Sequence, residues 1–312
     1  MQIENRLQRK ETIREILSDL ETLRAGGKFE NQYALEQNIR FFGAIKSIFH
    51  YIPWLLTVSP YIDGARLLEL QDFPFPRWDR EMHTRLIEME RKSRPGLIKP
   101  LVDRIIKFII DEHRTLVIAN FGYGGMEVER QVLQELLRRK YAVPVLFVGI
   151  DKSSVVPEIA KDNLKELGAA VNIDEVEKLT PDFLEKMRSE INKHTVLLCK
   201  NDVLSLTQFF PAGIFDLIFH SLFMHHLDPE EKRNIRSAIK SLAKNIFEYD
   251  GCKSLLVMIP QTIVGWNYPP FFNAEIFSNL RFDSKTQIRA YAESGKLSFL
   301  GNTGTYLWEY KK

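Results

Sequence analysis

The 312-residue chain contains only two cysteines, Cys199 and Cys252. Each lies in an apolar run, a pattern typical of buried thiols in a reducing compartment rather than of a disulfide framework. The N-terminal residues include no apolar segment of the kind found in export signals, and their acidic side chains do not fit a transit peptide. We therefore expect a cytoplasmic protein.

An excess of one charge is also missing. The 43 lysines and arginines are almost balanced by 41 aspartates and glutamates, which leaves a formal net charge of +2. This is too little for the broad basic surface of a nucleic-acid-binding protein. The basic run at residues 91–94 lacks the interleaved aromatic rings that a single-strand binder uses, so we expect no nucleic-acid partner.

No uninterrupted apolar run is long enough to cross a membrane. The stretch from Phe41 to Ile62 comes nearest, but it contains Lys46, His50, Pro53 and Pro60. A charge, a titratable ring and two helix breakers are costly at bilayer depth. We expect no stable membrane span, and instead a buried helical pair or a lid over an apolar pocket.

The N-terminal third has a helical pattern. Apolar residues recur every three or four positions in residues 1–25 and are followed by Gly26 and Gly27, which predicts a first helix. The pattern stays helical over residues 31–110, with breaks at 72–77 and 95–100. We expect residues 1–114 to form an all-helical cap that encloses a substrate, and residues 115–312 to form a second domain.

After Arg114 the chain alternates between helical stretches and short apolar runs, which we expect to be strands. The runs are residues 115–121, 144–150, 195–200, 215–220 and 254–259. Such alternation predicts a parallel α/β sheet with helices on both faces. Residues 296–300 and 305–310 flank Gly301-Asn-Thr-Gly304, which predicts an antiparallel hairpin.

A glycine-rich loop joins the first strand to the following helix and reads Asn120-Phe-Gly-Tyr-Gly-Gly-Met-Glu127. Glycines allow a sharp turn and a close approach of the backbone to a ligand. Glu127 stands where the dinucleotide fingerprint requires glycine, and no Gly-Lys-Ser/Thr follows, so NAD and nucleoside triphosphates are disfavoured. A tight turn without a ligand is the alternative interpretation.

Polar residues also follow the next two predicted strands. Asp151 can accept hydrogen bonds from two ribose hydroxyls, although it can also cap a helix. Asn201 and Asp202 can contact an adenine amine, with Val203 packed on the ring, although Asp202 can also be a turn residue. Because parallel strands present their carboxyl ends at one edge, these residues together predict an adenosyl ligand.

The stretch from Thr115 to Lys312 resembles the class I S-adenosylmethionine-dependent methyltransferases. Its loop is similar to the family's acid-x-Gly-x-Gly motif, with Asn120 in place of the acid, and FDLIFHSLFMHHL at 215–227 is similar to the family's FDLVxxxxxLHHL pattern. The resemblance implies a Rossmann-like, mostly parallel sheet of seven strands with the antiparallel C-terminal hairpin. It also implies S-adenosylmethionine as the cofactor. A second departure is the long link from Ala169 to His194, in which residues 180–191 predict an inserted helix.

The resemblance and the strand ends together assign the cofactor site. The cofactor-binding residues would be Asn120, Gly122, Tyr123, Gly124, Asp151, Lys152, Asn201, Asp202, Val203, His220 and Ser221. Within this set, Asp151 would hold the ribose. Lys152, Asp202 and Val203 would contact the adenine side.

Three histidines are candidates for catalysis. Methyl transfer mainly requires positioning of the acceptor, and a base is needed only when the acceptor carries a proton. Of His220, His225 and His226, we expect His225 to be the base, while His226 is more typical of packing or of a hydrogen bond to the next helix. We expect no metal, because no acidic or thiol ligand accompanies these histidines at a matching spacing.

Two aromatic clusters are candidates for the acceptor pocket: one at residues 41–54 and one at residues 266–272. Core packing is the favoured explanation for the first cluster, whereas the second follows a predicted strand as a short loop rich in rings and is favoured as a wall of the acceptor pocket. The candidate substrate-binding residues are Phe41, Trp54, Trp266, Tyr268 and Phe271.

The sequence thus predicts a methyltransferase that acts on a small aromatic or otherwise apolar molecule. Two alternatives stay open: another reaction of the same cofactor, such as aminopropyl transfer or cyclisation, and a catalytically silent S-adenosylmethionine-binding partner protein. Base methylation of DNA is disfavoured, because His220-Ser-Leu-Phe223 replaces the Asn/Asp-Pro-Pro-Tyr of those family members. The acceptor atom, the pathway and a possible homodimer are left open.

Overall fold

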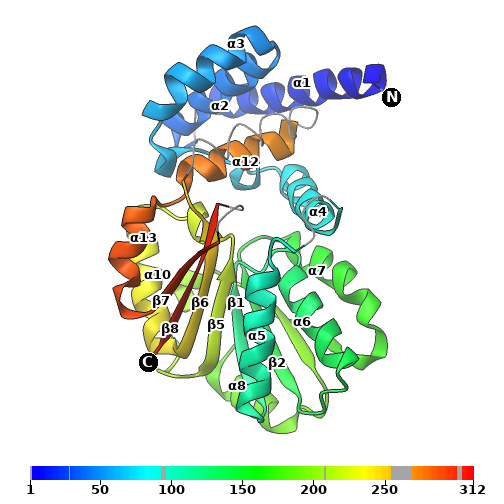
Figure 1. Ribbon diagram of the computed structural model, residues 1–312. Coiled ribbons are helices and arrows are strands. Elements are labelled where there is room, and N and C mark those ends of the chain that lie inside the picture. The colour runs from blue at the N-terminus through cyan, green and yellow to red at the C-terminus, as the bar shows by residue number, and fades with distance from the viewer. Residues whose placement is uncertain (1, 28, 93–95, 207–208, 254–268, 301–303) are drawn as a thin grey trace. The chain divides into compact units, whose positions relative to one another are not determined.

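The computed structural model describes the chain except for residues 1, 28, 93–95, 207–208, 254–268 and 301–303 (Figure 1). The chain forms two compact units. The first consists of Met1–Met82 and Lys253–Ser284, and the second consists of His83–Cys252 and Lys285–Lys312. This division differs from the expected domains 1–114 and 115–312, because residues 83–114 pack with the sheet and a late segment of the chain joins the N-terminal helices.

The described part of the first unit is helical. Its elements are α1 (Gln2–Gly26), α2 (Gln32–Ile45), α3 (Ile48–Pro53), η1 (Trp54–Val58), η2 (Ser59–Tyr61), η3 (Gly64–Arg66), η4 (Leu70–Asp72), the start of α4 (Pro76–Lys92) and α12 (Pro269–Arg281). Helix α1 confirms the predicted first helix. The side-chain amide oxygen of Asn31 accepts a hydrogen bond from the Ala34 N–H and so caps α2, which explains where this helix begins.

Aromatic rings dominate the core of the first unit. The Phe41 ring lies 5.0 Å from that of Trp54 and 4.8 Å from that of Phe277 on α12, measured between centroids. The stretch from Phe41 to Ile62 contains the end of α2 and the short elements α3, η1 and η2. Part of this stretch is buried, as predicted. Among the described residues, none of the helices combines the length and the apolar character that crossing a bilayer requires.

The second unit contains a sheet of eight strands. They are β1 (Leu116–Phe121), β2 (Val145–Asp151), β3 (Asn172–Val176), β4 (Thr195–Lys200), β5 (Phe215–Ser221), β6 (Ala243–Gly251), β7 (Lys296–Leu300) and β8 (Thr305–Lys311). Their order is β3-β4-β2-β1-β5-β6-β8-β7. All neighbours are parallel except β6 with β8 and β8 with β7. This topology confirms the predicted Rossmann-like, mostly parallel sheet with an antiparallel C-terminal hairpin.

Helices and short helical turns connect these strands. They are α5 (Lys99–Glu112), α6 (Glu127–Arg138), α7 (Val156–Leu164), η5 (Lys165–Ala170), α8 (Pro181–Glu190), α9 (Val203–Leu206), η6 (Met224–His226), α10 (Pro229–Leu242), α13 (Lys285–Tyr291) and η7 (Ala292–Ser294). Helices lie on both sides of the sheet (Figure 1). Leu116 and Ile118 contribute to one apolar cluster with α5 and α6, whereas Val117 and Ala119 contribute to another with α8 and α10. Alternate residues of one strand therefore face opposite layers, which is why the runs are apolar throughout.

The number and the positions of the strands differ from the prediction. It has eight strands rather than seven, because the link from Ala169 to His194 contains the edge strand β3 as well as the predicted helix, which is α8. Strand β3 is polar, and Asp174 and Glu175 are exposed, so no apolar run marked it. Strand β6 was also not predicted, and the strand expected at 254–259 lies outside the described residues.

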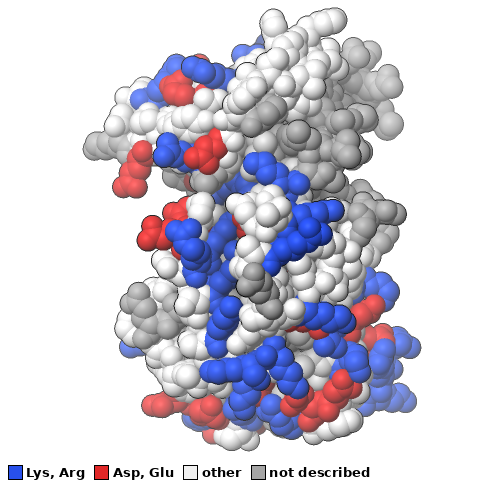
Figure 2. All heavy atoms as spheres, turned by 60° about the vertical axis from the view of Figure 1, so that its left-hand side comes forward, with Lys and Arg blue, Asp and Glu red and all other residues white. Residues whose placement is uncertain are grey.

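The mixture of surface charges and the burial of the two thiols agree with what the sequence predicts. Basic and acidic side chains are both present on the surface of the second unit (Figure 2). On α5, for example, the ammonium group of Lys99 lies 2.8 Å from a carboxylate oxygen of Asp103. Both cysteines are buried and neither forms a disulfide, which confirms the expectation of buried thiols.

Candidate functional site

The carboxyl ends of four strands lie side by side in the second unit. In the register of the sheet, Phe121 at the end of β1 is opposite Ile150, and Asp151 at the end of β2 is opposite Lys200 of β4. On the other side of β1, Asn120 is opposite Phe219 of β5. The loops that follow β1, β2, β4 and β5 therefore leave the sheet at one edge, where ligands bind in open α/β sheets.

The loop after β1 requires glycine for two reasons. Gly122 and Gly124 have φ angles of 68° and 48°, a left-handed conformation that most residues avoid. A Cβ atom at position 122 would also overlap the ring of Phe223, which follows β5. The backbone N–H of Gly122 donates a hydrogen bond to the Ile150 carbonyl at 2.8 Å, so the loop is held against the end of β2.

Asp151 links three of these strand ends. Its Oδ2 accepts a hydrogen bond from the backbone N–H of Gly124 at 3.3 Å, and its Oδ1 accepts one from that of Ser153 at 2.9 Å. Its own carbonyl accepts a hydrogen bond from the Asn201 N–H at 2.9 Å. The carboxylate is partly exposed, and helix α7 begins only at Val156 after Val155 as its N-cap, so Asp151 does not cap that helix.

The residues assigned to the adenine side lie at the ends of β2 and β4. Lys152 and Asp202 are exposed, and Val203 is buried. The Oδ1 of Asp202 accepts a hydrogen bond from the Leu204 N–H at 3.0 Å, so this carboxylate also has the local turn role that was its alternative. The side chain of Asn201 also makes a local hydrogen bond, because its oxygen accepts one from the Asp202 N–H at 2.8 Å.

Asn120 is buried and pairs with a carboxyl group that the sequence analysis did not identify. Its Nδ2 donates a hydrogen bond to Oε1 of Glu129 on α6 at 2.6 Å. Glu129 is fully buried, and this burial raises the pKa of its carboxyl group to about 7. The Asn120 Oδ1, the Glu129 Oε2 and the hydroxyl of the buried Tyr123 make no hydrogen bond with a described residue.

Glu127, at the start of α6, has a different environment from its neighbour Glu129. Burial alone would raise the pKa of Glu127, but hydrogen bonds from Arg130, Gln131 and Asn163 lower it below its usual value. The Glu127 carboxylate is thus bound by the guanidinium group of Arg130.

His220, near the end of β5, is fully buried beside a charged network. Its Nε2 lies 3.4 Å from Oε2 of Glu248 on the neighbouring strand β6, and neither ring nitrogen makes a hydrogen bond with a described residue. Burial would raise the pKa of Glu248, yet the charge and hydrogen bonds of Arg236 keep it below its usual range. The Arg236 Nη2 donates to Oε1 of Glu248 at 2.7 Å. Ser221, the last residue of β5, is partly exposed.

His225 is buried on the turn η6 and forms a pair with Asp250 at the end of β6. Its Nδ1 lies 3.0 Å from Oδ1 of Asp250, and its backbone N–H donates to Oδ2 of the same carboxyl group at 3.2 Å. Burial raises the pKa of Asp250 to about 7. The geometry is that of an imidazole whose tautomer and orientation are set by a carboxyl group.

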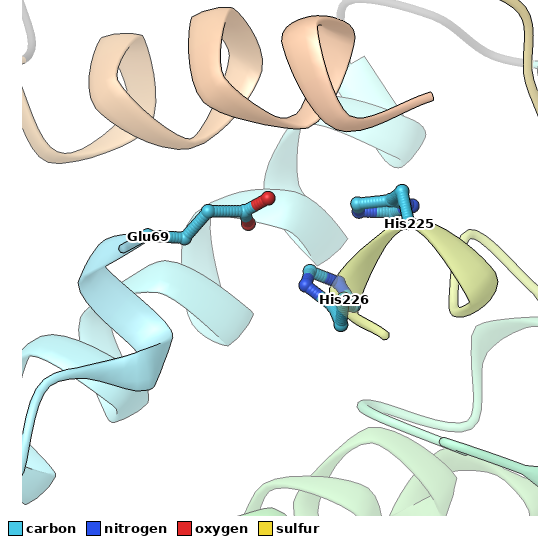
Figure 3. A group of neighbouring side chains, drawn as sticks. All are labelled: Glu69, His225 and His226. Carbon is cyan, nitrogen blue, oxygen red and sulfur yellow. The ribbon is translucent and has the colours of Figure 1, made fainter. Parts of the chain in front are cut away.

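His226 lies beside His225 on the same turn. Figure 3 shows both imidazole rings on η6, and their centroids are 3.9 Å apart. His226 is partly exposed, whereas His225 is buried. The third residue drawn there, Glu69, belongs to the first unit, where its carboxylate accepts a hydrogen bond from Ser278 at 3.0 Å and burial raises its pKa to about 8.

The candidate substrate-binding residues fall outside the second unit. Phe41 and Trp54 pack in the core of the first unit. Trp266 and Tyr268 lie outside the described residues, and Phe271 lies on α12 with a side chain that is likewise outside the description. Their contact with an acceptor stays a prediction.

Three carboxyl groups of the site were missed by the sequence analysis: Glu129, Glu248 and Asp250. A signal for the last two was present, because they are two residues apart within the run Ile246-Phe-Glu-Tyr-Asp250 and therefore share one face of a strand. Glu129 offered a weaker signal, an acidic residue in the first turn of the helix after the glycine loop.

The sequence matches no protein-family model and no curated protein. Among solved structures, the chain is similar to the CurJ carbon methyltransferase, with 11% identity and a TM-score of 0.49 over 90% of this chain and 70% of that chain. An O-methyltransferase family protein from Burkholderia thailandensis has 12% identity and a TM-score of 0.47 over 78% and 63%. The plantazolicin methyltransferase BamL, in complex with a triazolic desmethylPZN analog and SAH, has 12% identity and a TM-score of 0.46 over 76% and 95%. Likenesses at this identity and TM-score assign no activity to the chain.

Proposed function

We propose that the protein binds S-adenosylmethionine at the carboxyl edge of β1, β2, β4 and β5 and transfers its methyl group to a small aromatic or apolar acceptor. The observation that supports this most is the hydrogen bond between the Gly124 N–H and the Asp151 carboxylate at 3.3 Å. It brings the glycine loop beside the acid that would hold a ribose. When bound, the cofactor supplies an electrophilic methyl group on a sulfonium sulfur.

The chemistry of the edge fits the parts of this cofactor. An ionised carboxylate offers about four lone-pair sites, and Asp151, which accepts hydrogen bonds from the backbone N–H groups of Gly124 and Ser153, would also accept hydrogen bonds from the ribose hydroxyls. On the adenine side the contacts would come from Lys152, Asn201, Asp202 and Val203. The glycine loop, with Asn120, Gly122, Tyr123 and Gly124, would contact the methionyl part, and His220 and Ser221 would lie nearest the end of β5.

His225 is the residue to which we assign the role of general base. If its Nδ1–H donates to Asp250, its Nε2 carries the lone pair that can take a proton. Nε2 would then take the proton of the acceptor as the acceptor atom gains the methyl group that the bound cofactor would supply. His226 and His220 are the other candidates, and their positions beside His225 and Glu248 favour supporting roles.

Titration calorimetry with S-adenosylmethionine and S-adenosylhomocysteine tests the cofactor. We expect binding of both, and no binding of either at high micromolar concentration would overturn the proposal. Incubation with methyl-labelled cofactor and a panel of small aromatic and apolar acceptors then tests the reaction. S-adenosylhomocysteine as the product supports methyl transfer, whereas methylthioadenosine would indicate aminopropyl transfer instead. Binding without turnover across a broad acceptor panel would favour a silent binding protein.

A further inference from the structure

Two buried acceptor atoms lie in one hydrogen-bonded pair at the end of β1. The pair is Asn120 and Glu129, joined by the hydrogen bond from Nδ2 to Oε1 at 2.6 Å. Asn120 is 3% exposed and Glu129 is 0% exposed. The Oδ1 of Asn120 and the Oε2 of Glu129 accept no hydrogen bond from any described residue. Buried polar atoms without a partner are uncommon, so these two indicate a donor that is not among the described residues, such as a bound ligand.

The orientation of the Asn120 amide follows from its partner. When Glu129 is ionised its carboxylate only accepts hydrogen bonds, so the NH₂ group of Asn120 faces Glu129 and the Asn120 oxygen is left as a second acceptor. When Glu129 is ionised, the pair carries a negative charge and two unused acceptor atoms.

None of the nearby cations neutralises this charge in the described part of the chain. Arg130, one residue further along α6, binds Glu127 and Glu166 instead. The groups that act on Glu129 are Asn120, its own backbone and the like charge of Glu127. A buried carboxylate without a cation is costly, and the donor that would relieve this cost most is a positively charged one.

We propose that the Asn120–Glu129 pair is a subsite for a primary ammonium group, in which Glu129 supplies the negative charge that Asn120 lacks. This inference rests on the proposed function, in which the ammonium is that of the methionyl part of the cofactor. An ammonium group has three N–H donors, which suits two neighbouring acceptor groups better than a water molecule with two. Glu129 therefore takes the place of the acid that the family motif has at position 120.

The test uses the full chain, titration calorimetry at pH 8, and two ligands that differ by one group. The first ligand is S-adenosylhomocysteine, and the second is its deaminated analogue, in which hydrogen replaces the α-amino group. We expect the wild type to bind S-adenosylhomocysteine at least about tenfold more tightly than the analogue, as a charge-assisted hydrogen bond implies. In Glu129→Gln this preference should fall to about twofold or less, because the uncharged amide has nearly the same shape.

Two further variants make the result specific. Asn120→Asp combined with Glu129→Gln moves the carboxylate to position 120 and should restore the preference for the amine. Glu135→Gln on the same helix should leave the preference unchanged, because Glu135 pairs with Arg138 and Arg139.

The outcomes separate this inference from the proposed function. If the wild type binds neither ligand, the proposed function fails. If the wild type binds both and Glu129→Gln keeps the same preference for the amine, only the ammonium subsite is overturned. Equal weakening of both ligands by Glu129→Gln, with the preference retained, also overturns it, because the residue would then act only by shaping the loop.

Discussion

The imidazole Nδ1 of His225 lies 3.0 Å from Oδ1 of Asp250, and both side chains are buried. The two residues meet because β6 lies beside β5, with Ser221 opposite Tyr249, so the end of β6 lies next to the turn that follows β5. The same carboxyl group also accepts hydrogen bonds from the backbone N–H groups of His225 and Gly251. Asp250 therefore contacts both the ring and the backbone of His225, and the Nδ1 contact orients the imidazole as a general base requires.

Replacement of His225 by alanine should abolish most of the turnover. We expect a decrease of about 10² or more in kcat for an acceptor that carries a proton, because proton transfer by a positioned side chain contributes that much. The affinity for S-adenosylhomocysteine, measured by calorimetry, should change by no more than about twofold. Asp250→Asn should give a smaller loss of the same kind, because the ring would lose its orienting carboxylate. Turnover at the wild-type rate in His225→Ala would reduce this residue to a packing role.

Replacement of Asp151 by alanine should weaken cofactor binding. The variant loses hydrogen bonds between a carboxylate and the ribose hydroxyls, and we expect a cost of about 1 to 3 kcal/mol. Calorimetric titration with S-adenosylhomocysteine measures this cost. Asp174→Ala on the edge strand β3 is the control, since Asp174 is an exposed acid of the same sheet but lies in mid-strand. An unchanged dissociation constant in Asp151→Ala would contradict the assignment.

The stability of the ligand-free protein should depend on pH through Glu129. Burial raises the pKa of this carboxyl group from 4.5 to about 7, so the folded state favours its protonated form. The stabilisation is therefore fully present below about pH 4.5 and is lost as the pH rises through about 7, with a total of about 3 kcal/mol.

Comparison with Glu129→Gln isolates this contribution, because the other titrating groups are common to both proteins. The free energy of unfolding, measured by urea denaturation, should fall in the wild type relative to the variant between pH 4.5 and 7. A difference that is constant over this range would show that Glu129 titrates normally.

The buried pair of Arg236 and Glu248 should be far more sensitive to mutation than an exposed pair. Arg236→Met leaves the Glu248 carboxylate buried without its cation, which costs about 3 to 5 kcal/mol in such sites. Lys99→Met breaks an exposed ion pair of similar length and should cost less than about 1 kcal/mol. Urea denaturation compares the two. The double variant Arg236→Met, Glu248→Gln should recover part of the loss, and a single-variant cost as small as that of Lys99→Met would show that the pair is hydrated.

Two phenylalanines test the structure of the first unit. Phe41 is 0% exposed and packs against Trp54, whereas Phe49 is 82% exposed. Phe41→Ala should cost about 3 to 5 kcal/mol through the cavity that it leaves, and Phe49→Ala should change the stability by no more than about 0.5 kcal/mol. Thermal unfolding of both variants measures the difference. Equal effects would mean that this segment packs differently from the structure described.

Much of the site could be predicted from local patterns. Each of three features stands in or next to an apolar run: the glycine loop, the acid at the end of β2, and the motif that spans β5 and the turn after it. Parallel strands place such residues at one edge of the sheet. The partners of these residues could not be predicted in the same way. In the sequence, Glu248 and Asp250 are two polar residues beside apolar ones, and nothing in the local pattern predicts that they are buried. Their burial is explained by the contact of Glu248 with Arg236 and that of Asp250 with His225.

The amino-acid sequence by itself predicted the elements that are marked by a local pattern of apolar residues or turn residues: α1, α8, the strands β1, β2, β4 and β5, and the C-terminal hairpin. These depend on which side chains avoid water within one short segment, and that information is local. Only the tertiary structure decided the polar edge strand β3, the strand β6, the joining of residues 253–284 with the N-terminal helices, and the pairs Asn120–Glu129 and His225–Asp250. Each of these depends on strand order and register, which bring together groups whose burial is favourable only when their partners are present.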